Sequence, residues 1–390
     1  MGHISFLVTA VVITALAFDF TNGFHDTANS MATSIATGAL RPKVAVAISA
    51  VLNLCGAFLS VAVAKTISGG IIDEKAGIQP QVVFAALIGA IVWNLVTWLR
   101  GIPSSSSHAL YGGLLGATVV SVGLHGVHVD VVATKILIPA IASPIVAGVA
   151  AWGATKLSYR LTAKGDQEVT RKGFKVGQVA SAMLVSVAHG TSDGQKTMGV
   201  ITLTLITAHS LAPGSNPPLW VILAAGLTMG LGTYIGGWRI IRTMGKGITE
   251  VDASQGFTAQ TAAATVILTS SHMGYGLSTT HVCSGGIMGA GKGKVGGTVH
   301  WNTVRKMTYA WVLTLPAAGL VGGAGVLLAD QGAWGQIALG LIGAGIAAWI
   351  YVASRGQRIS AANVVAEDPL PVGAAAGQPA VASPSPVIAA

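Results

Sequence analysis

The chain has 390 residues, of which 52% are hydrophobic and only 9% are charged, and its mean hydropathy is +0.68. A soluble protein carries about 25% charged residues, so this composition excludes an ordinary soluble domain and predicts an all-α polytopic membrane protein. The net charge of +9 comes from short breaks between apolar runs. It therefore indicates membrane orientation rather than nucleic-acid binding.

The apolar runs have the length of membrane-spanning helices and do not alternate as barrel strands do. The first run lacks a basic start and a clear cleavage site, so we expect a retained helix rather than a signal peptide. The two cysteines, Cys55 and Cys283, lie in apolar context and indicate neither a disulfide framework nor a metal site. The predicted spans are residues 4–18, 44–64, 81–99, 131–152, 219–237, 308–329 and 332–353.

Two motifs recur in the same order along the chain. The stretch "GFHDTAN" aligns with "GTSDGQK", which places Asp26 on Asp193, and "SSSH", ending at His108, aligns with "STTH", ending at His281. The repetition predicts a duplicated unit, joined by a break rich in Lys and Arg and followed by a tail rich in Ala, Pro, Gly and Ser. The predicted parts are a first repeat at 1–155, a basic cytoplasmic linker at 156–175, a second repeat at 176–353 and a disordered tail at 354–390.

A duplicated membrane unit is typical of secondary transporters, whose binding sites lie between the repeats on interrupted helices. Asp26 and Asp193 each sit between two short apolar runs, so we expect broken helices there. The two Ser/Thr segments follow the helix-breaking residues Pro103 and Gly276. We therefore expect two re-entrant hairpins whose tips line a cavity. Behind the tips, the glycine spacing of 112–116 and of 285–289 predicts close packing of helices.

The duplicated aspartates are the first candidate functional residues. An ionisable group in apolar surroundings costs several kcal/mol and usually serves the passage of an ion or substrate. We therefore assign ion coupling to Asp26 and Asp193, with His25 beside the first. Lys196 lies three residues after Asp193, on the same helical face. It can pair with Asp193, contact an anion, or occupy the place of a metal cation, whereas the first half has Asn29 at the matching position.

The Ser/Thr clusters are the second candidate. One helix cap needs one hydroxyl, whereas here three stand in a row, twice. Hydroxyl groups and a helix N-terminus both favour an anion, so we predict that the two tips enclose one tetrahedral oxyanion. The residues concerned are Ser105, Ser106, Ser107, Ser278, Thr279 and Thr280.

Four further polar residues are expected next to this site. His108 and His281 occupy matching places, where they can bond the anion, relay a proton or hold the hairpin tip through backbone carbonyls. Asn22 and His189 also match each other across the two halves.

These motifs resemble those of the inorganic phosphate transporter (PiT) family over nearly the whole chain before the tail. "NGFHDTANSMAT" and "AHGTSDGQKTMG" are similar to its two signature motifs, "PSSSSH" and "LSTTH" to its hairpin motifs, and "WVLTLPAAG" to its C-terminal signature. The resemblance implies phosphate uptake coupled to an inward cation gradient, an inverted-repeat fold with re-entrant hairpins, and often a homodimer. It also implies that Asp26, Asn29 and Asp193 are core ion and phosphate positions.

Sodium-coupled members of that family typically show Asn-Asp-x-x-Asn in both halves. Here His25 replaces the first Asn of one motif, and Ser192 and Lys196 replace both in the other. These changes resemble the bacterial low-affinity branch associated with proton coupling and metal–phosphate complexes. A neutral metal–phosphate complex would also ease burial of the anion's charge.

We therefore expect a secondary active symporter, not an enzyme, that imports phosphate with protons across the inner (plasma) membrane. It would need no cofactor, and a divalent metal would travel with phosphate if the complex is the substrate. The alternatives are a sodium-coupled symporter, a transporter of another tetrahedral oxyanion and a passive anion channel. A serine hydrolase fits poorly, because duplicated Ser/Thr-His motifs do not give the asymmetric nucleophile and base that such an enzyme needs.

Overall fold

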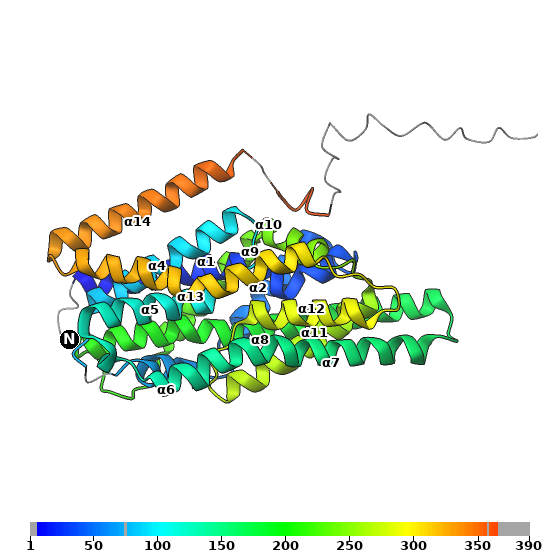
Figure 1. Cartoon of the computed structure of the whole chain (residues 1–390), viewed down its shortest axis with the longest axis horizontal. Helices are drawn as coiled ribbons and strands as arrows, with labels where there is room; N and C mark the ends of the chain where they lie inside the picture. The colour runs from blue at the N-terminus through cyan, green and yellow to red at the C-terminus, as the bar shows by residue number, and fades with distance from the viewer. Residues whose placement is uncertain (1–5, 74–75, 357–358, 366–390) are drawn as a thin grey trace, which may run out of the picture.

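The computed structural model describes residues 6–73, 76–356 and 359–365. These residues form helices and their connections, with a single isolated β-bridge between Ile72 and Val127 and no strand (Figure 1). The helices are α1 (Phe6–Ala36), α2 (Pro42–Gly56), α3 (Ala62–Lys65), η1 (Thr66–Ile71), α4 (Pro80–Leu99), α5 (Ser106–Val122), η2 (Leu124–Gly126), α6 (Val129–Val132), η3 (Ala133–Leu137), α7 (Ile138–Thr162), α8 (Gln167–Thr207), α9 (Leu219–Ile235), α10 (Trp238–Arg242), η4 (Thr243–Gly247), α11 (Ala253–His272), α12 (Thr279–Gly293), α13 (Trp301–Ala329) and α14 (Ala333–Ser354).

The all-α membrane architecture predicted from composition is confirmed. Five described helical segments are long and apolar enough to cross a bilayer, and a sixth forms if the bent pair of α9 with α10–η4 is one span. The five segments are Phe6–Ala36, Pro80–Leu99, Val129–Thr162, Trp301–Ala329 and Ala333–Ser354.

The expected helix breaks at the two aspartates are wrong in position. Asp26 and Asp193 lie inside α1 and α8, which are unbroken helices of 31 and 41 residues. Gly, Asp and Asn have low helix propensity, but propensity is a weak prior where neighbouring helices cover every face of a segment, as they do here. A broken span lies instead between α9 and α10, where the axis bends by 62° at Gly236, whose φ is 78°.

The span expected at 44–64 is also wrong in its extent. Helix α2 ends at Gly56, and a turn separates it from the short α3. A Cβ on Gly56 would lie 2.3 Å from the carbonyl oxygen of Val187 in α8, so a side chain at this crossing would push the two helices apart.

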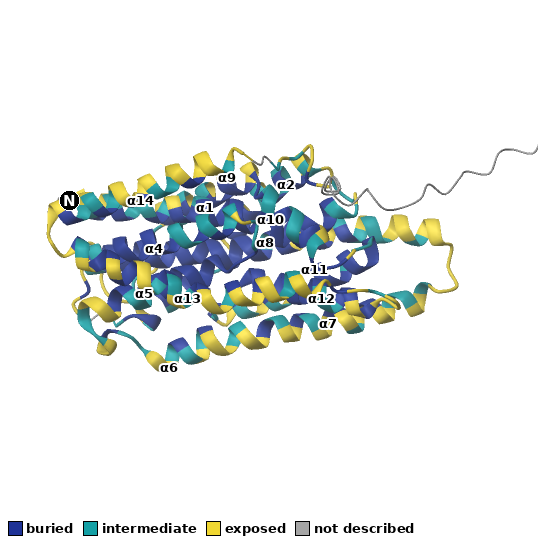
Figure 2. Ribbon diagram, turned by 45° about the horizontal axis from the view of Figure 1, so that its top comes forward, coloured by how far each residue is buried: buried dark blue, intermediate teal, exposed yellow. Residues whose placement is uncertain are grey.

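The long helices fall into two sets whose contacts correspond. In the first set α1 packs against α4 and α5 packs against α4; in the second set α8 packs against α11 and α12 packs against α11. The two sets interlock through four further helices. Helices α2 and α7 come from the first half of the sequence but pack against α8 and α12 of the second set. Helices α9 and α13 come from the second half but pack against α1 and α5 of the first set. Figure 2 shows the buried residues concentrated along the middle of this bundle. That the two sets are inverted copies stays a prediction.

The glycine spacing behind each hairpin tip gives the close packing predicted for it. A Cβ on Gly116 in α5 would lie 2.1 Å from the carbonyl oxygen of Gly319 in α13. In the second set, a Cβ on Gly289 in α12 would lie 1.9 Å from the carbonyl oxygen of Gly148 in α7. Backbone-to-backbone contact at these crossings fixes α5 and α12, and with them the polar tips at their N-termini.

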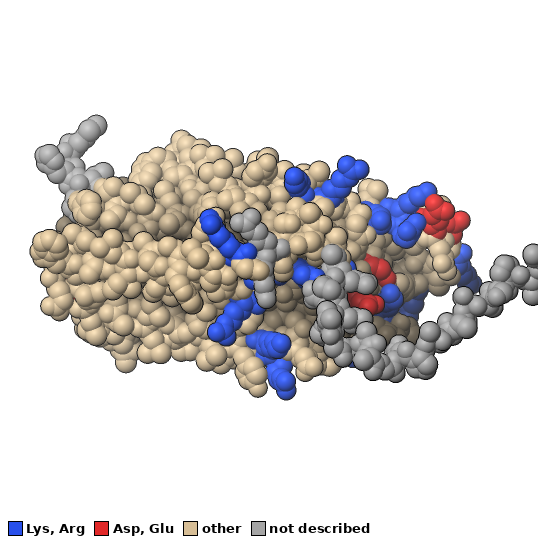
Figure 3. Space-filling view, turned by 90° about the horizontal axis from the view of Figure 1, so that it is seen from above, with Lys and Arg blue, Asp and Glu red and all other residues tan. Residues whose placement is uncertain are grey.

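Basic side chains mark one end of the bundle. In Figure 3, Lys and Arg gather on the half of the visible face nearer the α7–α8 junction. Three connections at the other end, residues 123–128, 208–218 and 330–332, contain no Lys or Arg, and the η1–α4 connection there has one Lys. By the positive-inside rule we expect the basic end in the cytoplasm, and this orientation stays a prediction.

The basic linker at 156–175 is largely helical. Helix α7 runs on to Thr162, and Asp166 caps the start of α8 by accepting hydrogen bonds from the backbone N–H groups of Glu168 and Val169. Of the tail predicted at 354–390, the structure describes 354–356 and 359–365; there, Val364 is buried in a hydrophobic cluster with Ile35 and Ile241. The remainder of the predicted tail lies outside the described residues.

Candidate functional site

The two duplicated aspartates meet in the middle of the bundle. Asp26 on α1 and Asp193 on α8 are fully buried, and these helices pack against each other. One ligand atom from each aspartate and one from His189 lie within 4.8 Å of one another. Aspartates from the two halves, predicted from separate motifs, therefore share one site.

The Ser/Thr segments form the N-termini of α5 and α12. Ser105 accepts a hydrogen bond from the backbone N–H of His108, and Ser278 accepts one from that of His281. One hydroxyl in each segment is thus used as a helix cap, which explains why the helices start at Ser106 and Thr279. The next two hydroxyls of the second segment contact the aspartates, whereas those of the first segment contact His25 and Lys196.

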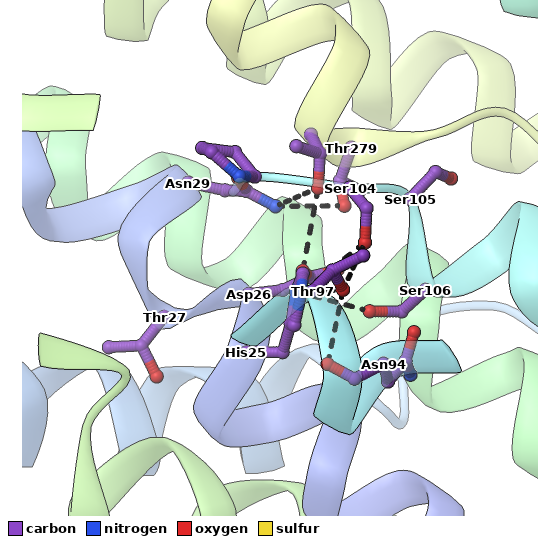
Figure 4. Close-up of polar contacts among 12 residues, drawn as sticks. His25, Asp26, Thr27, Asn29, Asn94, Thr97, Ser104, Ser105, Ser106 and Thr279 are labelled. Atoms are coloured by element: carbon purple, nitrogen blue, oxygen red, sulfur yellow. Dashed lines mark hydrogen bonds and ion pairs between the residues drawn. The ribbon is translucent and has the colours of Figure 1, made fainter. Parts of the chain in front are cut away.

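The second tip contacts both aspartates. Thr279 donates to Asp193 Oδ2 (3.1 Å) and Thr280 donates to Asp26 Oδ1 (3.4 Å). The side-chain amide of Asn29, one turn after Asp26, donates to both threonine hydroxyls at 3.2 and 3.1 Å. Figure 4 shows Asn29 reaching from α1 to Thr279.

Lys196 joins the first tip to the second. Its ammonium donates to Ser107 on α5, to Asp193 on its own helix and to the backbone carbonyl of Leu277, just before α12 (3.3 Å). Of the three roles left open for this lysine, pairing with Asp193 is the one seen. The predicted approach of the two tips is present, because one ammonium group reaches both.

His25 connects Asp26 to the first tip. Its Nδ1 lies 2.7 Å from Asp26 Oδ1 and 3.5 Å from Ser106 Oγ, while its Nε2 lies 3.3 Å from Thr97 and 3.4 Å from Ser104 (Figure 4). Sequence reasoning missed Thr97 and Ser104. The first is one of a few scattered polar residues in an apolar helix, and the second is the leading serine of the run, so each carried only a weak signal.

His189 and Asn22 lie in the same buried region, as expected. His189 Nε2 is 3.3 Å from Asp193 Oδ2 and 4.0 Å from Asp26 Oδ2, and its Nδ1 is 3.3 Å from the side-chain oxygen of Asn53 on α2. Asn22 lies one turn before Asp26 on α1 and is 1% exposed. Asn53 was not predicted, because α2 carries no motif.

The two histidines of the hairpin motifs pack edge-to-face against each other. The ring centroids of His108 and His281 are 4.8 Å apart, and Trp311 on α13 lies 4.2 Å from His281. His281 Nδ1 lies 3.2 Å from the carbonyl oxygen of Ala140, and Trp311 donates to the carbonyl of Pro103. Of the roles considered for this pair, the contacts seen are those that hold the tips together.

Several buried polar atoms at the centre have no hydrogen-bond partner among the described residues. They include Asn29 Oδ1, Ser192 Oγ and Asp26 Oδ2. Buried polar groups are nearly always paired, so these unpaired atoms beside the two aspartates point to a ligand. The group is rich in oxygen atoms and also has the ammonium of Lys196, so it can bind an oxyanion, a proton or a hard cation.

The donor set of Asp26, His189 and Asp193 fits a divalent metal ion in type and spacing, because two carboxylates and an imidazole are ordinary ligands. A phosphate oxygen would complete the coordination. The neighbouring ammonium of Lys196 opposes a second cation on Asp193, which limits such a site to one ion.

The fold and the site define a multi-pass membrane protein with a polar site buried between two corresponding sets of helices, as in secondary transporters. The model of the phosphate transporter family matches residues 22–322. The chain belongs to the phosphate transporter family, whose members are transport proteins and not enzymes.

Curated relatives cover most of the chain. It is 56% identical over 318 residues to a "probable low-affinity inorganic phosphate transporter" of Mycobacterium bovis, covering 81% of this chain and 76% of that protein. The protein of the same description from Mycobacterium leprae is 51% identical over 364 residues (92% and 87%), and that from Bacillus subtilis is 41% identical over 327 residues (83% and 97%). A solved structure, "The sodium-dependent phosphate transporter", has a TM-score of 0.75 and 22% identity, covering 84% of this chain and all of that chain. At that identity the likeness shows the fold alone.

Proposed function

We propose that the protein is a secondary active symporter that imports inorganic phosphate together with protons. The observation that carries the proposal is the fixed contact of Lys196 with Asp193, Ser107 and Leu277. An ammonium group holds the place beside Asp193 where a coupling cation would otherwise bind. Coupling therefore falls to Asp26, whose partner is the titratable ring of His25.

Electrostatics gives the reason for a proton. A phosphate held between the tips lies next to two carboxylates in a region of low dielectric, where like charges repel strongly. Lys196 offsets one carboxylate. A proton taken up by the His25–Asp26 pair removes the second negative charge or adds a positive one, so that the loaded carrier can reorient, and release of phosphate and proton on the cytoplasmic side resets it.

A second candidate substrate is a metal–phosphate complex. It is supported by the spacing of Asp26, His189 and Asp193, whose ligand atoms lie within 4.8 Å. In that case the metal would be part of the cargo and would bridge the carboxylates and the phosphate.

Uptake of radiolabelled phosphate by proteoliposomes tests both. We expect accumulation against a gradient when the outside is acidic and sodium is equal on the two sides. A sodium gradient without a pH gradient should drive none. Accumulation that requires sodium would overturn proton coupling, and equilibration without accumulation would indicate a channel. A requirement for Mg²⁺ would select the metal complex, and competition by sulfate and arsenate would rank other oxyanions.

The matched variant is Asp26→Asn, which removes the titratable carboxyl but keeps its shape. It should lose accumulation driven by the pH gradient while still exchanging phosphate for phosphate. Asp130→Asn, which changes an exposed carboxylate far from the site, serves as the control and should accumulate phosphate normally. Normal accumulation by Asp26→Asn would remove this carboxyl from the mechanism.

A further inference from the structure

A second polar cavity opens on the cytoplasmic end of the bundle. It has a volume of about 450 Å³ and lies between the α4–α5 connection, the α10–η4 segment and the start of α13. We call it the basic vestibule. Its lining includes Arg100, Pro103, Arg242, Lys246, Thr303 and Lys306.

The charge of the basic vestibule is one-sided. Four cationic side chains from three elements line it, and no Asp or Glu is among its described lining residues: the four are Arg100, Arg242, Lys246 and Lys306. By contrast, the cavity beside the α7–α8 junction is lined by side chains of both signs, Arg171 and Asp252. The like charges of Arg100, Lys246 and Lys306 around one cavity focus a positive potential into it, so an anion bound there is stabilised.

The lining has the donors that a phosphate group requires. Guanidinium groups bind phosphate oxygens through two parallel hydrogen bonds, and an ammonium adds a point charge with further donors. The ammonium of Lys246 also donates to the backbone carbonyl of Val365, which leaves its other donors for a ligand. Thr243 and Thr303 also line the cavity, as do the buried Pro103 and Met307, and the Thr243 hydroxyl donates to the backbone carbonyl of Gly101.

The basic vestibule is one residue away from the central site along the chain. Pro103 forms its wall, and the next residue, Ser104, lies 2.8 Å from Thr97 and 3.4 Å from His25. The carbonyl of Pro103 also accepts the hydrogen bond from Trp311, which packs on His281. An anion in the vestibule is therefore next to the connection that carries the first hairpin tip.

From this geometry we infer that the basic vestibule is a second binding site for a phosphate group, separate from the central site. Two sources have this chemistry at a cytoplasmic membrane surface: inorganic phosphate leaving the central site, and the headgroup of an anionic phospholipid. The inference rests on the phosphate transport of the family and not on proton coupling.

The test measures how accessible a cysteine in the wall of the basic vestibule is to a labelling reagent. Cys55 is replaced by Ser, and Thr303→Cys places a thiol in the wall. The labelling rate by a charged maleimide is then measured on the full-length protein in nanodiscs of neutral phosphatidylcholine. Inorganic phosphate should slow labelling severalfold relative to chloride at equal ionic strength. The protection should disappear in Arg100→Gln/Lys306→Gln and persist in the matched pair Arg160→Gln/Lys164→Gln, whose exposed charges lie at the same end outside the cavity.

Two further arms separate the sources and the sites. Nanodiscs containing phosphatidylglycerol, without added phosphate, should slow labelling only if a lipid headgroup fills the site. Protection by phosphate should remain in Asp193→Asn, whose central site is impaired, so the vestibule is judged independently of the transport mechanism. The inference is overturned if neither phosphate nor anionic lipid slows labelling, or if the Arg100/Lys306 variant is protected as well as its parent.

Discussion

Lys196 places an ammonium group between the two polar helix starts, and its partner Asp193 is fully buried. Two opposite charges removed from water are tolerated only when they are paired and hydrogen-bonded. The remaining donors of Lys196 go to Ser107 and Leu277, so all of its polar capacity is used inside the site. The side chain thus has a structural role as well as an electrostatic one.

A double-mutant cycle separates the two roles. Lys196→Gln leaves a buried carboxylate without its partner, which typically costs about 3–5 kcal/mol. We expect a marked fall in the thermal unfolding midpoint in detergent. Asp193→Asn/Lys196→Gln, which removes both charges, should regain most of that loss while transport stays absent. A double variant as unstable as the sum of the two single variants would show that the pair is not coupled.

At this scale the sequence predicted residue types better than contacts. The i, i+3 spacing placed Lys196 beside Asp193, and duplication placed Asp26 with Asp193, because both rules follow from helix geometry or internal repetition. The contacts of His25 with Thr97 and of His189 with Asn53 could not be predicted from the sequence. They join helices far apart in the chain, and an isolated Thr or Asn in an apolar helix carries no pattern.

At the scale of the elements, the polar residues of α1 and α8 show why helix breaks could not be located from local sequence. The stretch around Asp26 contains Gly, His, Asp and Asn, and in isolation it would make a poor helix. In the protein it is covered on all sides, and every unmade backbone hydrogen bond there would leave a buried polar group unsatisfied. The bend falls at Gly236 instead, where a positive φ angle ends α9.

The crossing of α12 with α7 provides a test of how the second tip is held. Gly289→Ala places a Cβ 1.9 Å from the carbonyl oxygen of Gly148, so the helices must separate. Overpacking of this kind costs about 1–3 kcal/mol, and we expect a lower unfolding midpoint and reduced phosphate uptake. Gly345→Ala on α14 is the control, because its Cβ would meet nothing within 4 Å. Equal stability of the two variants would mean that this crossing does not position the tip.

Across the whole molecule, the two sets of helices exchange their outer members, so that α7 covers α12 and α13 covers α5. Each polar tip is therefore covered by a helix from the other half of the sequence, so the site requires both halves. The sequence predicted two repeats and their motifs, since these are visible as internal similarity. It could not predict the exchange, because long-range partner choice depends on the shapes of packed surfaces rather than on any local pattern.

The distribution of charge makes the orientation of the whole molecule testable. In a Cys55→Ser background, Ser210→Cys lies in the exposed α8–α9 connection, which has no Lys or Arg, and Lys172→Cys lies at the exposed basic end. Because basic segments stay in the cytoplasm, a membrane-impermeant maleimide should label only Ser210→Cys in intact cells, and both variants after permeabilisation. The reverse pattern would place the basic vestibule outside the cell, where it could receive phosphate before import but not after release.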